Sequence, residues 1–213
     1  MRRETISKKI ILSEYSSYRK KSQIFLIKDI LSHIADNPVR LLDVGPGPGI
    51  TLEALLESNG KIFCVGAEVD QDHIISVKPI KDKYPNRFSF VINGRKELPF
   101  SDNSFDIVFS IAALHHFLCP RDMLTEMVRV VKRGGKVLVY DINPESLKIK
   151  ILSRMYSFAN LFFKKAIIDA FIDSVKVSYK ANQIINMVGD IPGVRSNLTQ
   201  KYLYNILIMN KKI

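Results

Sequence analysis

The sequence predicts an α/β fold in which helices cover both faces of a parallel sheet. Between residues 38 and 142, short apolar runs alternate with segments whose apolar residues recur at helical spacing, which is typical of parallel strands joined by helices. The first run ends in glycines at every second position, Gly45, Gly47 and Gly49, and a helical pattern follows at once. Two extended runs near the end of the chain predict an antiparallel hairpin.

The expected elements follow one another along the chain. A helical pattern covers residues 13–34 and ends before Pro38. The expected strands are 40–44, 62–68, 88–92, 105–110 and 136–140. Of the helices between them, one begins after Gly49, one covers 71–83 with an interruption at Pro79, and one covers 119–131. The run Lys132, Arg133, Gly134 and Gly135 is expected to close that last helix.

The alternation of strands and helices stops after Asp141. Residues 145–177 form a basic amphipathic helical pattern, followed by a short helix over 181–188 and by hairpin strands over 194–198 and 202–209. The apolar side of the 145–177 pattern contains Ile149, Leu152, Tyr156, Ala159 and Phe163. Two interpretations stay open: a helix that packs on the sheet, or a lid whose apolar face lines a ligand pocket.

Length and composition indicate one domain. The 213 residues, of which 46% are hydrophobic, suit one domain with a substantial core. Within it, the patterns described above predict a helical lead-in (1–37), a ligand-binding core (38–142), a helical lid insertion (143–180) and a C-terminal helix and hairpin (181–213). The net charge of +11 is compatible with an anionic partner but does not determine a fold. No apolar run has the length of a signal peptide core or a membrane span, and the two cysteines lack metal-site spacing, so we expect a cytoplasmic protein without a metal.

The glycine turn predicts a nucleotide-binding loop. Glycine allows close approach of a ligand to the backbone, and the following helix begins with unpaired N–H groups. Because Pro46 and Pro48 lack an N–H, the expected donors are those of Gly45, Gly47, Gly49 and Ile50. A dinucleotide fingerprint would have its third glycine at position 50, where this chain has isoleucine. A plain turn without a ligand is the alternative.

Glu68 ends the second expected strand. A carboxylate at this position can accept hydrogen bonds from ribose hydroxyls, although it can also be an ordinary polar residue at a strand end. The glycine turn upstream favours the ligand-binding interpretation.

Four motifs in order resemble class I S-adenosylmethionine-dependent methyltransferases, and the likeness is closest to the small-molecule branch that includes ubiquinone and menaquinone biosynthesis enzymes. The motifs are 42–49 (LDVGPGPG), Glu68, 98–108 (LPFSDNSFDIV) and 134–138 (GGKVL). The resemblance covers residues 38–142 well. It implies a Rossmann-like, doubly wound sheet of seven strands, mostly parallel with an antiparallel last strand, and S-adenosylmethionine as cofactor, with S-adenosylhomocysteine as product.

The resemblance also implies a set of cofactor-binding residues. These are Asp43, Gly45, Pro46, Gly47, Gly49, Glu68, Val69, Asn93, Gly94, Arg95, Ser110 and Ile111. Members of the family often have an acidic residue near the adenine amino group where this chain has Gly94. The side-chain oxygen of Asn93 and the backbone N–H of Arg95 are the expected substitutes.

Methyl transfer needs a general base only when the acceptor must lose a proton. The candidates are His115, His116, Tyr15 and Tyr18, and because adjacent residues face different directions, at most one of the two histidines should reach an acceptor. All four also have a purely structural interpretation.

The expected function is methyl transfer to a small acceptor that is lipid-like or acidic, with peripheral membrane contact as a further expectation. The alternatives are an S-adenosylmethionine-binding protein without catalysis, a methyltransferase acting on RNA or protein, and a nucleotide-dependent oxidoreductase, which Ile50 disfavours. No basic segment with interleaved aromatics indicates a nucleic-acid partner. The sequence does not predict the oligomeric state.

Overall fold

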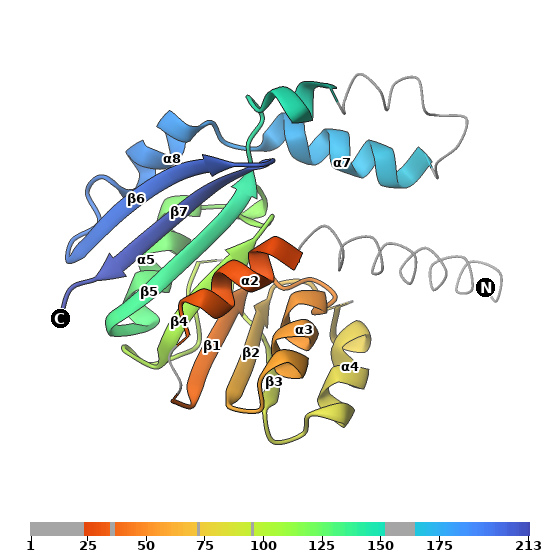
Figure 1. Ribbon diagram of the computed structural model, residues 1–213, viewed down its shortest axis with the longest axis vertical. Coiled ribbons are helices and arrows are strands. Elements are labelled where there is room, and N and C mark those ends of the chain that lie inside the picture. Colours follow the sequence, from red (N-terminus) through yellow and green to blue (C-terminus); the bar gives the residue numbers. More distant parts are fainter. Residues whose placement is uncertain (1–23, 35–36, 72, 95, 152–164) are drawn as a thin grey trace.

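A seven-stranded sheet organises the computed structural model, which describes residues 24–34, 37–71, 73–94, 96–151 and 165–213. The strands are β1 (Val39–Val44), β2 (Ile62–Glu68), β3 (Phe88–Ile92), β4 (Phe105–Ile111), β5 (Val131–Ile142), β6 (Val194–Lys201) and β7 (Tyr204–Lys211). Their spatial order is β3-β2-β1-β4-β5-β7-β6 (Figure 1). Strands β1 to β5 pair in parallel, whereas β7 runs antiparallel to both β5 and β6. The predicted fold is confirmed.

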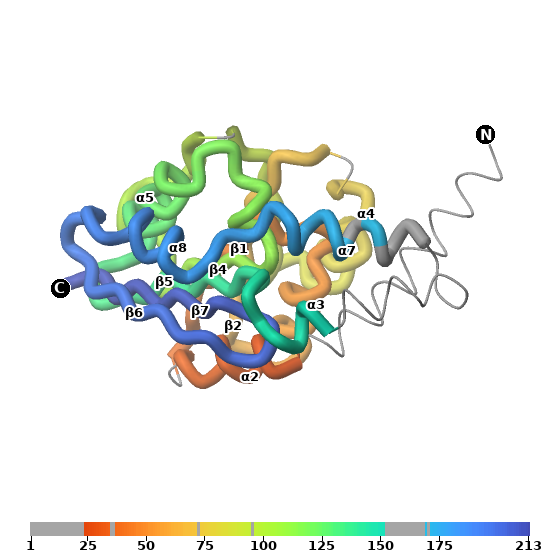
Figure 2. Tube along the Cα trace, turned by 90° about the horizontal axis from the view of Figure 1, so that it is seen from above, coloured from red at the N-terminus to blue at the C-terminus, as the bar shows by residue number. Residues whose placement is uncertain are grey.

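The helices connect the strands and cover both faces of the sheet. They are α2 (Ile24–Ser32), α3 (Ile50–Ser58), α4 (His73–Lys83), α5 (Pro120–Val130), α7 (Lys165–Val177) and α8 (Ala181–Val188), together with the 3₁₀ turn η1 (Leu114–His116). Figures 1 and 2 show α2 and α5 on opposite sides of the strands. No helix among the described residues is long and apolar enough to cross a lipid bilayer.

Each face of the sheet has its own apolar core. On one face, fully buried leucines and isoleucines of α2 and α3, such as Leu26, Ile30 and Leu55, pack against β1, β2 and β4. On the other face, Met123 and Met127 of α5 pack against β4 and β5, together with α8. Burying one such side chain is worth about 1.5–3 kcal/mol. Because both faces of the sheet are covered, the sequences of the central strands are nearly continuous apolar runs.

Local sequence sets the ends of α5. Pro120 occupies its first turn, where a missing N–H costs nothing, Asp122 lies in the first turn and Arg129 in the last, as the helix dipole favours. Apolar residues at helical spacing then bury one side of the helix.

Strand β5 differs from the sequence-based expectation. Residues 132–135 were expected to end the preceding helix, but α5 ends at Val130 and these residues belong to β5, with an irregular register between Phe105 and Ile107 of β4. At Gly135 an added Cβ would lie 2.7 Å from the Asp106 carbonyl oxygen and 2.9 Å from that of Lys132. The glycine therefore allows a close backbone approach, which a pattern of cations and glycines does not distinguish from a helix cap.

Other boundaries shift by a few residues. Helix α4 passes through Pro79 without the expected interruption, and the hairpin strands are longer than expected, with a turn at Tyr202 and Leu203. Helix α2 begins at Ile24, and the earlier part of the predicted 13–34 helix lies outside the described residues. Of the predicted 145–177 helix, residues 147–151 and 165–177 are helical, and 152–164 lie outside the described residues.

Replacing Gly135 with alanine tests the close approach in β5. The added methyl group would force the strands apart, and we expect Gly135→Ala to lower the free energy of unfolding by about 1–3 kcal/mol in urea titrations. Gly60→Ala is the matched control, because nothing lies within 4 Å of the Cβ it would add. Equal stability of the two variants would contradict this account of β5.

Candidate functional site

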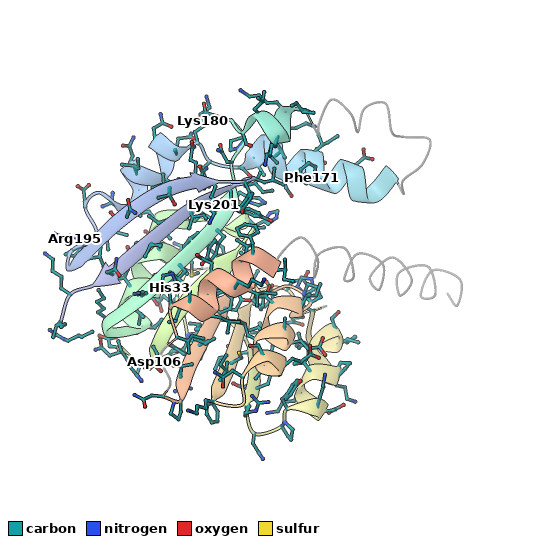
Figure 3. All side chains as sticks on the ribbon, in the orientation of Figure 1. His33, Asp106, Phe171, Lys180, Arg195 and Lys201 are labelled. Carbon is teal, nitrogen blue, oxygen red and sulfur yellow. The ribbon has the colours of Figure 1, made fainter. Side chains whose placement is uncertain are left out.

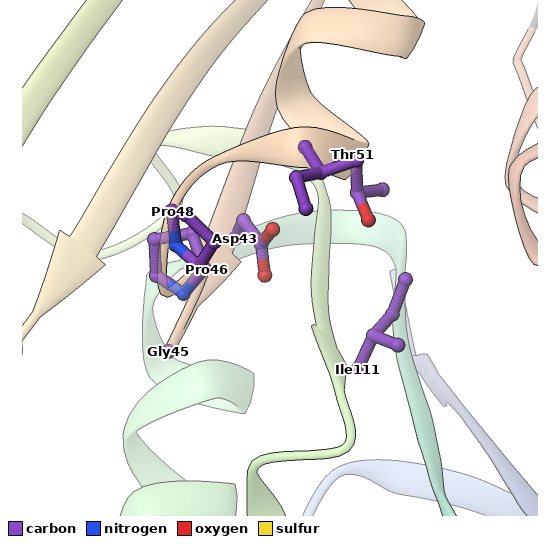
Figure 4. A pocket seen from close by; sticks show the side chains of 7 residues that line it. Asp43, Gly45, Pro46, Pro48, Thr51 and Ile111 are labelled. Atoms are coloured by element: carbon purple, nitrogen blue, oxygen red, sulfur yellow. The ribbon is translucent and has the colours of Figure 1, made fainter. Parts of the chain in front are cut away.

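A small cleft lies where the strand order reverses, between β1 and β4. Figure 4 shows it at the end of β1, bounded by the side chain of Asp43, the glycine turn, the start of α3 and Ile111 of β4. In doubly wound sheets, ligands bind at this switch point, outside the carboxyl ends of the strands. Asp43 is 2% exposed, so its carboxylate is held within the protein rather than in solvent.

The three glycines of the turn all have left-handed backbone angles. The φ values are 79° at Gly45, 54° at Gly47 and 76° at Gly49, which residues with a Cβ rarely adopt. At Gly45 an added Cβ would lie 2.7 Å from Cβ of Ala113, whereas at Gly47 the nearest atom, in His73, is 3.8 Å away. Gly45 thus serves close packing, while the backbone at Gly47 is open to a ligand.

The expected hydrogen-bond donors of the turn are mostly used within the protein. The Gly45 N–H donates to the Ala67 carbonyl (2.9 Å) and the Gly49 N–H to the Pro46 carbonyl (3.1 Å). The Gly47 N–H donates to Oε2 of Glu68 at 3.0 Å. The expectation that these N–H groups all await a ligand is therefore wrong; the turn instead fixes the position of Glu68.

Glu68 receives hydrogen bonds on both carboxylate oxygens. Besides Gly47, the N–H groups of Val69 (2.8 Å) and Asp70 (3.3 Å) donate to Oε1, and Nδ1 of His73 lies 3.3 Å from Oε2. Burial by itself raises the pKa of Glu68, but the hydrogen bonds from His73 and the backbone outweigh it and hold the pKa below the ordinary value. These four contacts correspond to the four lone-pair sites of an ionised carboxylate, so ribose hydroxyls would have to replace the two longer contacts, from Asp70 and His73.

The loop after β3 holds a buried acceptor. The backbone N–H of Asn93 donates to the Glu68 carbonyl (2.9 Å), and its side-chain Nδ2 donates to the Gly94 carbonyl (2.8 Å). Its Oδ1 is buried and has no partner among the described residues. This orphaned oxygen, beside the open backbone of Gly94, fits the amino group of an adenine. Arg95 lies outside the described residues.

Two other predicted cofactor residues have different environments. Val69 follows Glu68 and its side chain is exposed. Ser110 is fully buried, and its hydroxyl donates to the Val44 carbonyl at 2.7 Å, so it fastens β4 to β1 and does not face the cleft. The hydroxyl hydrogen of Ser110 is thus used within the sheet, whereas its neighbour Ile111 lines the cleft; that either residue contacts the cofactor stays a prediction.

The two histidines among the candidate bases differ in burial. Nδ1 of His115 lies 2.7 Å from Oδ1 of Asp141, and both side chains are buried. His116 is exposed, with its ring centroid 4.1 Å from that of His115, so the two histidines do face different environments. Tyr15 and Tyr18 lie outside the described residues, as do Tyr156 and Phe163 of the predicted lid.

Sequence reasoning missed three residues at this edge. Thr51 lines the cleft, His73 approaches Glu68, and Asp141 pairs with His115. Asp141 carries the same signal as Glu68, a carboxylate near the end of an apolar strand. Thr51 and His73 belong to helical patterns in which an isolated polar residue carries no distinguishing signal.

Residues 42–139 match a family model described as a methyltransferase domain. This part of the chain is similar to methyltransferase domains, and the fold around it is that of solved S-adenosylmethionine-dependent methyltransferases. S-adenosylmethionine is the cofactor of such domains, and three features of the structure suit that molecule. These are an open backbone at Gly47, a Glu68 whose pKa is lowered at the end of β2, and a buried side-chain oxygen of Asn93 without a partner among the described residues.

Curated relatives match the same region of the chain. An uncharacterized methyltransferase of Bacillus subtilis is 33% identical over 103 residues, which are 48% of this chain and 40% of the relative. A demethylmenaquinone methyltransferase of Thermotoga maritima is 28% identical over 123 residues, 57% of this chain and 51% of the relative. The chain thus spans about half the length of these relatives or less.

Solved structures share the fold across nearly the whole chain. A putative S-adenosyl-L-methionine-dependent methyltransferase of Methanococcus maripaludis has a TM-score of 0.67 at 18% identity, covering 93% of this chain and 92% of its own. One from Aquifex aeolicus has a TM-score of 0.64 at 16% identity, covering 87% and 88%. The [4+2]-cyclase SpnF, with a TM-score of 0.59 at 17% identity and coverage of 88% and 80%, has the same fold, so fold alone does not determine the reaction.

The lowered pKa of Glu68 predicts how stability depends on pH. Because folding lowers this pKa from 4.5, the ionised carboxylate stabilises the fold above pH 4.5, and the contribution is lost as the pH falls through the lowered value. We expect Glu68→Gln to be less stable than wild type by about 1 kcal/mol near neutral pH, since bonds to a charged acceptor are stronger. Urea titrations from pH 7 to pH 3 should show the difference shrinking below pH 4.5; a constant difference would contradict the assignment.

Proposed function

We propose that this protein transfers a methyl group from S-adenosylmethionine to a small, lipid-like acceptor. The observation that carries the proposal is the hydrogen-bonded link between Gly47 and Glu68, because it joins the glycine turn to the carboxylate that a ribose requires. Both lie at the carboxyl ends of neighbouring parallel strands, where this fold binds ligands.

Each residue of the site has a proposed role in holding the cofactor. Glu68 accepts hydrogen bonds from the ribose hydroxyls, and Oδ1 of Asn93 accepts one from the adenine amino group. Asp43 offers a buried negative charge to the ammonium group of the methionine portion, and Ile111 and Thr51 line the remainder of the cleft. When bound, S-adenosylmethionine supplies a methyl group on a sulfonium that departs by direct displacement.

The chain contributes mainly alignment. A displacement that needs three atoms in line gains from holding the reactants in place, with effective molarities on the order of 10⁵–10⁸ M in well-oriented systems. The rigid glycine turn and the paired loops after β1 and β2 provide that fixation on the cofactor side. A binding protein without catalysis would keep the same contacts, so turnover on an acceptor panel separates these two functions.

Cofactor binding is the first experiment. We expect calorimetry to detect S-adenosylhomocysteine binding to wild type and Glu68→Ala to weaken it about ten- to a hundredfold, because a charge-assisted pair of hydrogen bonds is worth about 1.5–3 kcal/mol. Glu57→Ala is the control, since its carboxylate makes a surface ion pair with Lys83 on α4. Stronger binding of NAD than of S-adenosylhomocysteine would overturn the proposal.

An exposed aromatic and basic surface supports a lipid-like acceptor. The tyrosine patch comprises Tyr202, Phe25, Lys148 and Lys201. Tyr202 is 54% exposed in the β6–β7 turn, and its ring packs against that of Phe25 at a tilt of 55°, with centroids 4.8 Å apart. The Nζ atoms of Lys148 and Lys201 each lie 5.5 Å from the centre of the same ring.

The position of the tyrosine patch also fits a membrane contact. Ile142 at the carboxyl end of β5 pairs with Tyr204, so the patch adjoins the edge of the sheet that carries the cleft. Figure 3 shows Lys180 and Lys201 toward the end of the molecule opposite Asp106. Aromatic rings with lysines around them favour the interface of an anionic bilayer, where a lipid acceptor resides. The named activity of the Thermotoga maritima relative agrees with an acceptor of this kind.

Vesicle binding tests the patch. We expect the protein to sediment with phosphatidylglycerol-containing vesicles more than with pure phosphatidylcholine vesicles, and the double variant Lys148→Ala/Lys201→Ala to bind roughly thirtyfold more weakly, at about 1 kcal/mol for each lysine. Lys61→Ala/Lys78→Ala removes the same charge from exposed positions elsewhere. Equal loss in both double variants would indicate nonspecific attraction and argue against the patch.

A further inference from the structure

The buried pair of His115 and Asp141 lies at the carboxyl edge of the sheet. His115 belongs to η1, directly after β4, and Asp141 is the penultimate residue of β5. Their side chains are 1% and 0% exposed, and Nδ1 of the imidazole is 2.7 Å from Oδ1 of the carboxylate. A distance this short in a buried environment indicates a charge-assisted hydrogen bond.

The pair leaves two polar atoms unsatisfied. Nε2 of His115 and Oδ2 of Asp141 are buried and have no hydrogen-bond partner among the described residues. Because a carboxylate accepts, Nδ1 carries the hydrogen in the neutral imidazole and Nε2 presents a lone pair. A buried polar atom without a partner costs about 1–3 kcal/mol, which an incoming hydroxyl would recover.

A strained turn brings this pair against the cofactor loop. Ala112 has a φ of 51°, a left-handed conformation that costs a residue with a Cβ about 1–2 kcal/mol, and its N–H donates to the Tyr140 carbonyl at 2.7 Å. The next residue, Ala113, contacts the glycine turn at Gly45 so closely that no Cβ fits there. The chain thus reverses between cleft-lining Ile111 and His115, and strain of this kind persists where the surrounding structure enforces it, often at active sites.

We propose that Nε2 of His115 accepts the proton of an acceptor hydroxyl during methyl transfer, and that Asp141 stabilises the resulting imidazolium. This inference rests on the proposed function and adds that the acceptor is a hydroxyl compound. The acceptor oxygen uses its electron pair to bond the methyl carbon, the sulfur retains the pair of the bond that breaks, and the hydroxyl proton moves to Nε2. That proton then passes to water, which restores the neutral imidazole.

Nitrogen NMR on the complete protein tests the proposal without knowledge of the natural acceptor. The chain has four histidines, so the signal of His115 is assigned from separate variants at His33, His73 and His116 as well as from His115→Gln. In ¹⁵N-labelled protein saturated with S-adenosylhomocysteine, we expect His115 to carry its hydrogen on Nδ1. Added phenol should shift the Nε2 signal, whereas anisole, which lacks the hydroxyl hydrogen, should not.

Asp141→Asn supplies the second measurement. Without the carboxylate the Nδ1–H tautomer loses its preference, and we expect hydrogen on Nε2 and loss of the phenol response, with S-adenosylhomocysteine affinity within about twofold of wild type. A hydrogen on Nε2 in wild type, or phenol and anisole acting alike, would overturn the proposal, since a purely structural pair predicts no difference between them. Failure to bind S-adenosylhomocysteine would instead overturn the proposed function. The response of the His115 signal to phenol and anisole could then still be compared in the free protein.

Discussion

Parallel strands joined by crossover helices must all end at the same edge of a sheet, and this constraint determines where chemistry can occur in the molecule. Four residues near the ends of parallel strands are far apart in sequence: Asp43 of β1, Glu68 of β2, Ile111 of β4 and Asp141 of β5. The sheet brings them to one edge. The strands β1 and β4 are neighbours, but the chain continues from β1 to β2 on one side and from β4 to β5 on the other. The cleft lies between these two diverging connections.

Burial then decides which polar groups can act. The carboxylate of Glu68 stays ionised because backbone N–H groups surround it, and the loop that supplies one of them is the glycine turn. Ser110 on β4 is fully buried and donates its hydroxyl to the Val44 carbonyl of β1, so it stabilises the sheet and its hydrogen is not available to a ligand. Oδ1 of Asn93 and Nε2 of His115, in contrast, are buried at this edge and have no hydrogen-bond partner among the described residues.

Much of this could be predicted from the sequence, for physical reasons that differ between residues. Strand and helix patterns, the glycine turn and Glu68 depend on local periodicity and on one strand end, which the chain displays directly. Other features depend on contacts that local periodicity does not display. Examples are the hydrogen bond from the Gly45 N–H to the Ala67 carbonyl and the pairing of His115 with Asp141. Gly134 and Gly135 were misassigned because a helix cap and an irregular strand both favour glycine.

Strand β5 places two adjacent residues on opposite faces of the sheet. Tyr140 packs in the α2 layer, where its hydroxyl donates to Asp29 at 2.7 Å, and Asp141 points to the other layer, where it meets His115. An insertion or deletion of one residue between Gly135 and Tyr140 would exchange the two side chains, placing a carboxylate under α2 and a phenol beside the imidazole. Length variation in this strand among natural homologues should therefore be confined to the irregular segment before Lys136, where one residue more or less leaves the order of the faces unchanged.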